Sequence, residues 1–142
     1  MELRMYKNVL VPVDLEHKDQ ASTMIQTALA IAGASIQLTL LFVMPEIPAS
    51  AALHIPAGTF EKGKADAEAE LRQLAEAHNV LETTKVITEV GRPHHEILEY
   101  ADRNGVDLIV IASHKPILSD YLLGSVAASV VRHAKCSVHV IR

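Results

Sequence analysis

The sequence predicts a doubly wound α/β fold, in which helices cover both faces of one parallel sheet. Two observations carry this prediction. Short β-branched stretches alternate with segments of helical periodicity along all 142 residues, an order typical of right-handed βαβ units. Hydrophobic residues make up 49% of the chain but aromatic residues only 4%, so the core is aliphatic, as in buried parallel strands. The length favours one domain, residues 1–142.

The first half of the chain contains two predicted strands and two predicted helices. Residues 8–13 form a β-branched strand with Pro12 at its end, because proline donates no backbone hydrogen bond and is disfavoured inside a central strand. Residues 22–32 carry apolar side chains on one helical face, and Gly33 stands where a helix ends. The elements that follow are a strand at 37–44, a long surface loop at 45–63 and a helix at 64–78.

The second half continues the alternation. Pro93 holds a favoured first-turn position of the helix predicted at 94–103. Residues 107–112, Asp-Leu-Ile-Val-Ile-Ala, are the clearest buried strand. In such folds ligands bind beyond the carboxyl ends of the strands, where the strand order reverses, so residues that follow the strands are the functional candidates. The remaining predicted elements are strands at 85–90 and 138–141 and a helix at 126–133.

Composition argues against several classes of function. The formal net charge is −4, which disfavours nucleic-acid binding, a function that normally needs clustered Lys and Arg. No apolar run approaches the ~20 residues of a membrane span, and the first residues lack the apolar region of a signal peptide, so we expect a cytoplasmic protein. The single cysteine, Cys136, fits that compartment and is interpreted as a small buried apolar residue. The eight histidines are scattered without metal-ligand spacing, so no metal site is expected.

One glycine-containing motif resembles a phosphate-binding loop and is rejected. Residues 58–65, Gly-Thr-Phe-Glu-Lys-Gly-Lys-Ala, match a P-loop except at Ala65, where a hydroxyl group would ligate magnesium. A P-loop also follows a buried strand, and the sequence before residue 58 does not predict one. We interpret the segment as a loop that leads into a helix.

The stretch after the clearest strand carries the chemistry. Ala112 and Ser113 are small and leave backbone amides accessible to an anion, while Lys115 adds a positive charge. Gly124 and Ser125 begin a helix whose free N–H groups and positive dipole end can hold phosphate. A simple helix start explains Gly124 and Ser125 equally well when they are taken alone.

Three parts of the chain together resemble the universal stress protein (UspA-like) family. They are the first strand with Asp14, the turn Gly91-Arg92-Pro93 with Ile97, and the C-terminal stretches 109–114, 122–127 and 130–140. The resemblance covers nearly the whole chain. It implies a five-stranded parallel sheet in the order 3-2-1-4-5, of the Rossmann-like and adenine nucleotide alpha hydrolase-like type. It also implies cytoplasmic residence and a homodimer joined through strand 137–142, with assembly into tetramers left open.

The resemblance implies ATP as the ligand, with Mg²⁺ as its possible companion. Asp14 would hydrogen-bond the ribose, Pro12 and Val13 would flank the adenine, and Val43 would meet the adenine edge through its backbone. Residues 112–115 would wrap the ribose and phosphates, and residues 124–126 would bind phosphate. The implied nucleotide site therefore consists of Pro12, Val13, Asp14, Val43, Ala112, Ser113, His114, Lys115, Gly124, Ser125 and Val126.

The chain departs from the ATP-binding signature of the family. Ala112 and Lys115 stand at its first two glycines, and the spacing before Gly124 is one residue shorter. The Ser-His-basic-Pro loop and the Tyr-Leu-Leu-Gly-Ser motif nevertheless resemble a branch that is still associated with ATP. Two alternatives follow. The first is an ATP-binding regulatory module of the stress response, with at most slow hydrolysis or autophosphorylation, since His114 is the one nearby candidate base. The second is a nucleotide-free dimeric interaction module.

Overall fold

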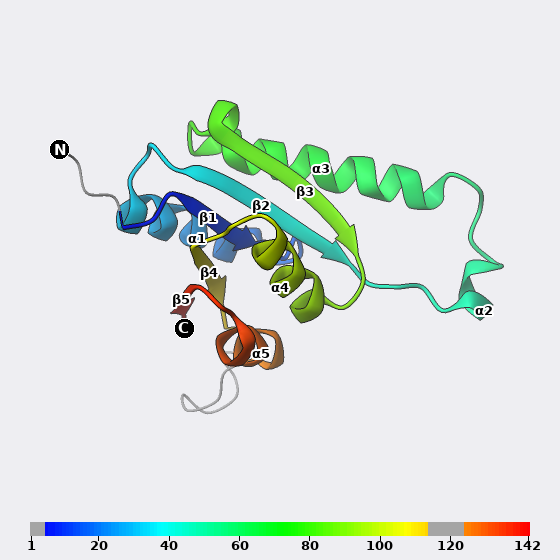
Figure 1. Ribbon diagram of the computed structural model, residues 1–142. Coiled ribbons are helices and arrows are strands. Elements are labelled where there is room, and N and C mark those ends of the chain that lie inside the picture. Colours follow the sequence, from blue (N-terminus) through cyan, green and yellow to red (C-terminus); the bar gives the residue numbers. More distant parts are fainter. Residues whose placement is uncertain (1–4, 114–123) are drawn as a thin grey trace.

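This computed structural model describes residues 5–113 and 124–142. Within these ranges, five parallel strands form one sheet in the order β3-β2-β1-β4-β5 (Figure 1). This order confirms the expected topology and places the reversal of strand order between β1 and β4. The strands are β1 (Asn8–Pro12), β2 (Gln37–Met44), β3 (Thr84–Val90), β4 (Leu108–Ala112) and β5 (Ser137–Ile141).

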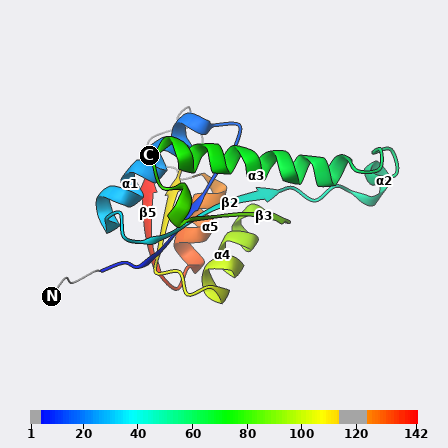
Figure 2. The same cartoon turned by 90° about the horizontal axis from the view of Figure 1, so that it is seen from above.

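Helices cover both faces of the sheet, as Figures 1 and 2 show from two directions. One layer consists of α1 (Lys18–Ala32) and α3 (Thr59–Ala77), and the other consists of α4 (Pro93–Arg103) and α5 (Ser125–His133). This arrangement confirms the predicted doubly wound α/β fold. Over the described ranges, no helix combines the length and the apolar character needed to cross a membrane. Two short elements complete the fold, α2 (Ala49–Ala52) and the 3-10 helix η1 (Leu81–Thr83).

The strands are buried on both faces because their side chains alternate between two apolar cores. Val9 and Val11 of β1 pack on the side of α1 and α3, whereas Leu10 packs on the side of α4 and α5. All three side chains are fully buried, and every residue of β4 is buried as well. A strand that is covered on both faces needs an uninterrupted aliphatic run, which accounts for the aliphatic composition.

Two predicted element boundaries are wrong. The segment 45–63 was expected to be a loop, but it contains α2, and α3 begins at Thr59 rather than at 64. Gly63 lies inside α3, where one glycine costs only about 1 kcal/mol relative to alanine and the surrounding Glu, Lys and Ala are strong helix formers. Similarly, α1 begins at Lys18 rather than at 22, because its first turn is polar and escapes an apolar pattern.

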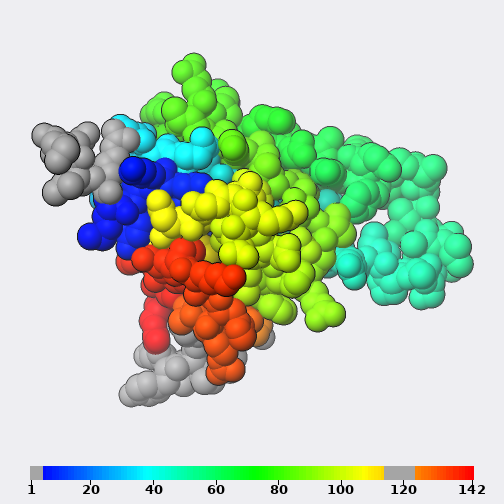
Figure 3. Space-filling model, in the orientation of Figure 1, coloured from blue at the N-terminus to red at the C-terminus, as the bar shows by residue number. Residues whose placement is uncertain are grey.

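Residues 47–65, which contain α2 and the first turns of α3, project from the body of the molecule as an arm (Figure 3). Large apolar side chains are exposed on it, with 44% of Ile47, 85% of Leu53 and 36% of Phe60 accessible to solvent. The P-loop-like residues 58–65 lie in this arm, mostly inside α3, where a helical backbone cannot wrap a phosphate. This placement agrees with the rejection of that motif.

Candidate functional site

β1 and β4 are joined at their N-terminal ends and separate at their carboxyl ends. The Asp107 carboxylate, just before β4, accepts hydrogen bonds from the backbone N–H groups of Lys7 and Asn8 at 2.9 and 3.1 Å. The pairing of β1 with β4 ends at Leu10 and Ile109, although β1 continues to pair with β2 beyond that point. A gap therefore opens at the reversal of strand order.

Pro12 contributes to this separation. Successive backbone N–H groups of a strand point to opposite neighbours, and the N–H of Val13 donates to the carbonyl of Leu41 in β2 at 2.8 Å. The nitrogen of Pro12 therefore faces β4, and a proline has no hydrogen to donate there. A residue that looks unfavourable for a central strand is thus placed where the strand must release its neighbour.

A cleft of about 320 Å³ occupies the gap. Its walls come from the ends of three strands, the starts of α4 and α5 and one residue of α1, so six separate segments of the chain meet at one edge of the sheet. This is the edge at which ligands of doubly wound folds bind. Six of the residues expected from the sequence line the cleft: Pro12, Val13, Asp14, Val43, Ala112 and Val126.

Several apolar walls of the cleft are residues that no sequence pattern assigns to a site. Met24 of α1, Phe42 of β2 and Ile97 of α4 also line it. Helical spacing marks Met24 and Ile97 as inward-facing, but spacing does not distinguish a side chain packed in the core from one that borders a cavity. Glu16 is a further lining residue that no sequence pattern identified.

The carboxylate of Asp14 is oriented by its own loop. Its Oδ1 accepts a hydrogen bond from the backbone N–H of Glu16 at 2.9 Å, and its Oδ2 lies 3.1 Å from Nδ1 of His17. The backbone N–H of His17 also donates to the carbonyl of Asp14 at 3.0 Å. These contacts form an Asx turn, which holds a partly exposed carboxylate on the wall of the cleft.

The end of β4 and the start of α5 meet beside the cleft. The backbone N–H of Gly124 donates to Oγ of Ser113 at 3.3 Å. Gly124 is the N-cap residue of α5, Ser125 is its exposed first residue, and no described side chain caps the helix. The amide groups of the first turn are therefore available to a ligand. His114 and Lys115 lie outside the described residues, so their contacts stay predictions.

The charge of the walls restricts how the cleft can hold a ligand. Asp14 and Glu16 are both acidic, and no other described residue in the lining is ionisable. An anionic ligand must therefore be held by backbone N–H groups and by the positive end of the α5 dipole, together with any cation supplied by the loop after β4. The apolar walls suit a heteroaromatic base, and the Asp14 carboxylate suits sugar hydroxyl groups.

The described residues fit an adenine nucleotide better than a metal ion of their own. Apolar walls, a carboxylate and a helix N-terminus that no described side chain caps match the base, the ribose and the phosphates in turn. Among the residues in the described ranges, no group of three or more His, Cys, Asp or Glu side chains could hold a metal ion.

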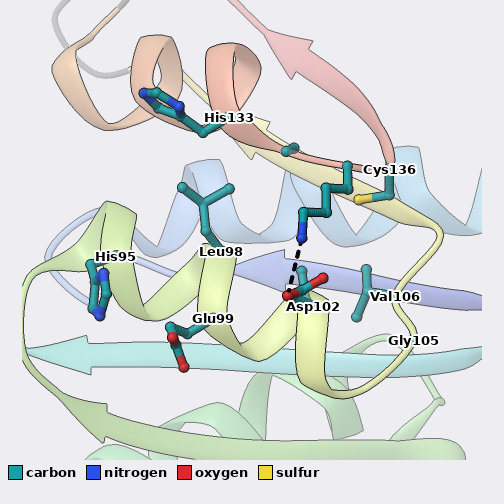
Figure 4. Close-up of a pocket in the computed structure, with 11 residues that line it drawn as sticks. His95, Leu98, Glu99, Asp102, Gly105, Val106, His133 and Cys136 are labelled. Atoms are coloured by element: carbon teal, nitrogen blue, oxygen red, sulfur yellow. Dashed lines mark ion pairs between the residues drawn. The ribbon is translucent and has the colours of Figure 1, made fainter.

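A larger cavity, of about 420 Å³, lies between α4 and α5 (Figure 4). Lys135 reaches across it to Asp102, with Nζ 3.5 Å from Oδ2, so these two charges neutralise each other. Much of the lining, including Gly105 and His133, follows or ends a helix, where the negative end of the dipole disfavours anions. This cavity is therefore a poorer site for a nucleotide than the cleft.

Cys136 lines this larger cavity and not the cleft. Burial is the main influence on its thiol and raises the pKa above the ordinary value; a backbone hydrogen bond lowers it and the charge of Asp107 raises it to smaller extents. A thiol that stays protonated is a weak nucleophile. Cys136 packs against the core on the side of α4 and α5, but it is partly buried rather than buried as expected.

The fold and the cleft define a class of α/β proteins that hold ligands at the carboxyl ends of parallel strands. Comparison with known proteins gives the family. The family model described as the universal stress protein family matches residues 5–142. Universal stress protein G of Escherichia coli O157:H7 is 33% identical over 143 residues, which cover 97% of this chain and 100% of the relative. The chain belongs to the universal stress protein family.

Solved structures share the same fold. Universal stress protein UspA from Lactobacillus plantarum matches with a TM-score of 0.76 and 30% identity, over 99% of this chain and 100% of the other. A universal stress protein solved in complex with cAMP matches with a TM-score of 0.66 and 25% identity, over 96% of this chain and 97% of the other.

Proposed function

We propose that this protein binds ATP in the cleft and acts in the cytoplasm as a regulatory module of the stress response. One observation carries the proposal. The cleft combines apolar walls, the Asp14 carboxylate and an α5 N-terminus that no side chain in the described ranges caps, at the reversal of strand order. The relative solved with cAMP supports an adenine nucleotide as the ligand class, since cAMP shares its base and most of its ribose with ATP. The stress-response role rests on family membership.

The expected site residues divide into four groups in this proposal. Pro12, Val13 and the backbone of Val43 border the adenine, and Asp14 accepts hydrogen bonds from the ribose. Lys115 supplies the side-chain cation that the described walls lack. The bound nucleotide sets the conformation of the protein or its choice of partner. Because no general base is assigned, hydrolysis or autophosphorylation is at most slow. The remaining contacts to ribose and phosphates come from Ala112, Ser113, His114, Gly124, Ser125 and Val126.

The first experiment asks whether the natural chain carries or binds the nucleotide. The purified protein is denatured with acid, and the supernatant is analysed by chromatography for adenine nucleotides. The melting temperature is then measured with and without millimolar ATP and Mg²⁺, because a ligand that binds only the folded state raises it. Absence of nucleotide together with an unchanged melting temperature would refute the proposal and favour the nucleotide-free interaction module.

A variant of Gly124 tests the position of the phosphates. Gly124 has φ −59° and ψ 153°, a conformation that valine adopts without strain, so Gly124→Val places a branched side chain beside the α5 amides while the backbone is retained. We expect ATP binding to be lost. Ala128→Val is the matched control, because it adds the same side chain to an exposed position of the same helix. Equal ATP affinities in the two variants would contradict the assigned site.

We also infer that the protein forms a homodimer through β5. Among the described strands, β5 is an edge of the sheet, and its sequence Ser-Val-His-Val-Ile contains neither a charged residue nor a proline. The opposite edge strand, β3, is protected by Lys85 and Glu89. An unprotected apolar edge favours pairing with a second copy of the same strand.

Backbone direction selects a variant that tests this dimer. The carbonyl of Ile141 accepts a hydrogen bond from Ser113 beyond β4, so the N–H of Val140, one residue earlier, points away from β4. Val140→Pro removes that outward donor and spares the bonds to β4. We expect the natural chain to be a dimer and the variant a monomer by light scattering. A natural chain that is monomeric at micromolar concentration would contradict the inference.

A further inference from the structure

We infer that His17 is a positioning residue for the ribose, acting through the carboxylate of Asp14. The inference rests on the proposed function, because it concerns how the ATP site is held. Nδ1 of His17 lies 3.1 Å from Oδ2 of Asp14. A carboxylate only accepts hydrogen bonds, so Nδ1 of the neutral ring carries the hydrogen and donates it to Asp14.

The place of His17 in the chain supports this role. His17 is the N-cap residue of α1, a position that favours Ser, Thr, Asp or Asn because their side chains cap the first helical amides. The imidazole makes no such capping bond. The ring contacts Asp14, so the side chain at this position stabilises the loop before the helix.

Two contacts within the described residues engage both oxygens of Asp14. The N–H of Glu16 donates to Oδ1 at 2.9 Å, while Nδ1 of the His17 ring lies 3.1 Å from Oδ2. A carboxylate offers about four acceptor positions, so an oxygen that accepts from a protein donor can also accept from a ribose hydroxyl group. Without the His17 ring, Oδ2 loses this donor and the carboxylate is held less firmly, so part of the binding energy is spent on ordering it.

His17→Ser tests the inference without weakening the fold. Serine is a favoured N-cap residue, so α1 keeps its start, and its short side chain cannot reach Asp14 as the imidazole does. Two probes are titrated by calorimetry, ATP and 2′,3′-dideoxyATP. The second lacks the ribose hydroxyl groups from which Asp14 would accept hydrogen bonds. We expect His17→Ser to bind ATP about three- to tenfold more weakly than the natural chain, the size of one lost ordering hydrogen bond. Its affinity for the dideoxy analogue should change less than twofold.

A double-mutant cycle identifies the partner through which His17 acts. In the background of Asp14→Ala, adding His17→Ser should change ATP affinity by less than twofold, because the group that it orients is already absent. An equal loss for both probes, or no loss for either, would overturn the positioning role while the ATP site stands. If the natural chain itself fails to bind ATP, the proposed function fails first and the role of His17 fails with it.

Discussion

Replacement of Asp14 by alanine removes the group assigned to the ribose. The expected loss of ATP affinity can be estimated from the structure. A hydrogen bond to a charged group contributes about 1.5–3 kcal/mol. The side chain of Asp14 is 33% exposed, so water competes for its oxygens and the lower part of that range applies. We expect a loss of about 1.5–2 kcal/mol, or ATP binding weaker by about 10- to 30-fold. Calorimetric titration of the two proteins with ATP measures it.

Two matched variants separate the role of Asp14 from general effects of charge and folding. Asp14→Asn keeps an oxygen for the N–H of Glu16 and for one ribose hydroxyl group, so its loss should be smaller than that of Asp14→Ala. Glu16→Gln removes the other acidic charge of the cleft wall, so ATP binding should tighten slightly. If Asp14→Ala binds ATP within twofold of the natural chain at an equal melting temperature, the reasoning about the ribose position is refuted.

Three further predictions concern the framework of the cleft. Gly91→Ala should lower the free energy of unfolding by about 1–3 kcal/mol in urea titrations, because Gly91 has φ +151° and a Cβ there would lie 2.6 Å from Oε1 of Glu96; an unchanged urea midpoint would contradict this. Asp107→Ala removes the acceptor of the N–H groups of Lys7 and Asn8, which water partly replaces, so the free energy of unfolding should fall by about 1 kcal/mol in the same assay. An unchanged free energy of unfolding would contradict a role of this carboxylate in joining β1 to β4. The raised pKa of Cys136 means that the unfolded chain releases its thiol proton at a lower pH than the folded chain does. The contribution of this thiol to the free energy of unfolding should therefore be fully present below pH 9.0 and decline as the pH rises above it. Cys136→Ala should flatten that decline, and an equally steep decline in the variant would assign it to other groups.

The fold was predictable from the sequence because its signal is local and repeated. Each strand such as 107–112 is an aliphatic run, and each helix shows an apolar face, so their alternation specifies a doubly wound sheet. The strand order itself came from family resemblance. The arm escaped prediction because the proline and glycine residues of segment 45–63 resemble a loop, whereas the helix there is stabilised by the propensity of its whole window.

Residue patterns alone pointed to the candidate site only where a strand ends. Asp14 and Ala112 could be selected on that ground, whereas Val43 and Val126 came from the family resemblance, and all four line the cleft. Met24 and Phe42 could not, because a cavity wall and a packed core demand the same apolar side chains. The contact between His17 and Asp14 depends on how one loop turns, which residue spacing does not reveal.

Calorimetric titration of the natural chain with ATP, in the presence of Mg²⁺ and again with EDTA, tests the central claim most directly. Adenine and ribose contacts involve no metal ion, so the account predicts saturable binding of one ATP per chain in both solutions, tighter when Mg²⁺ offsets the phosphate charge. No heat of binding at millimolar ATP, in a protein shown by chromatography to be free of bound nucleotide, would contradict it.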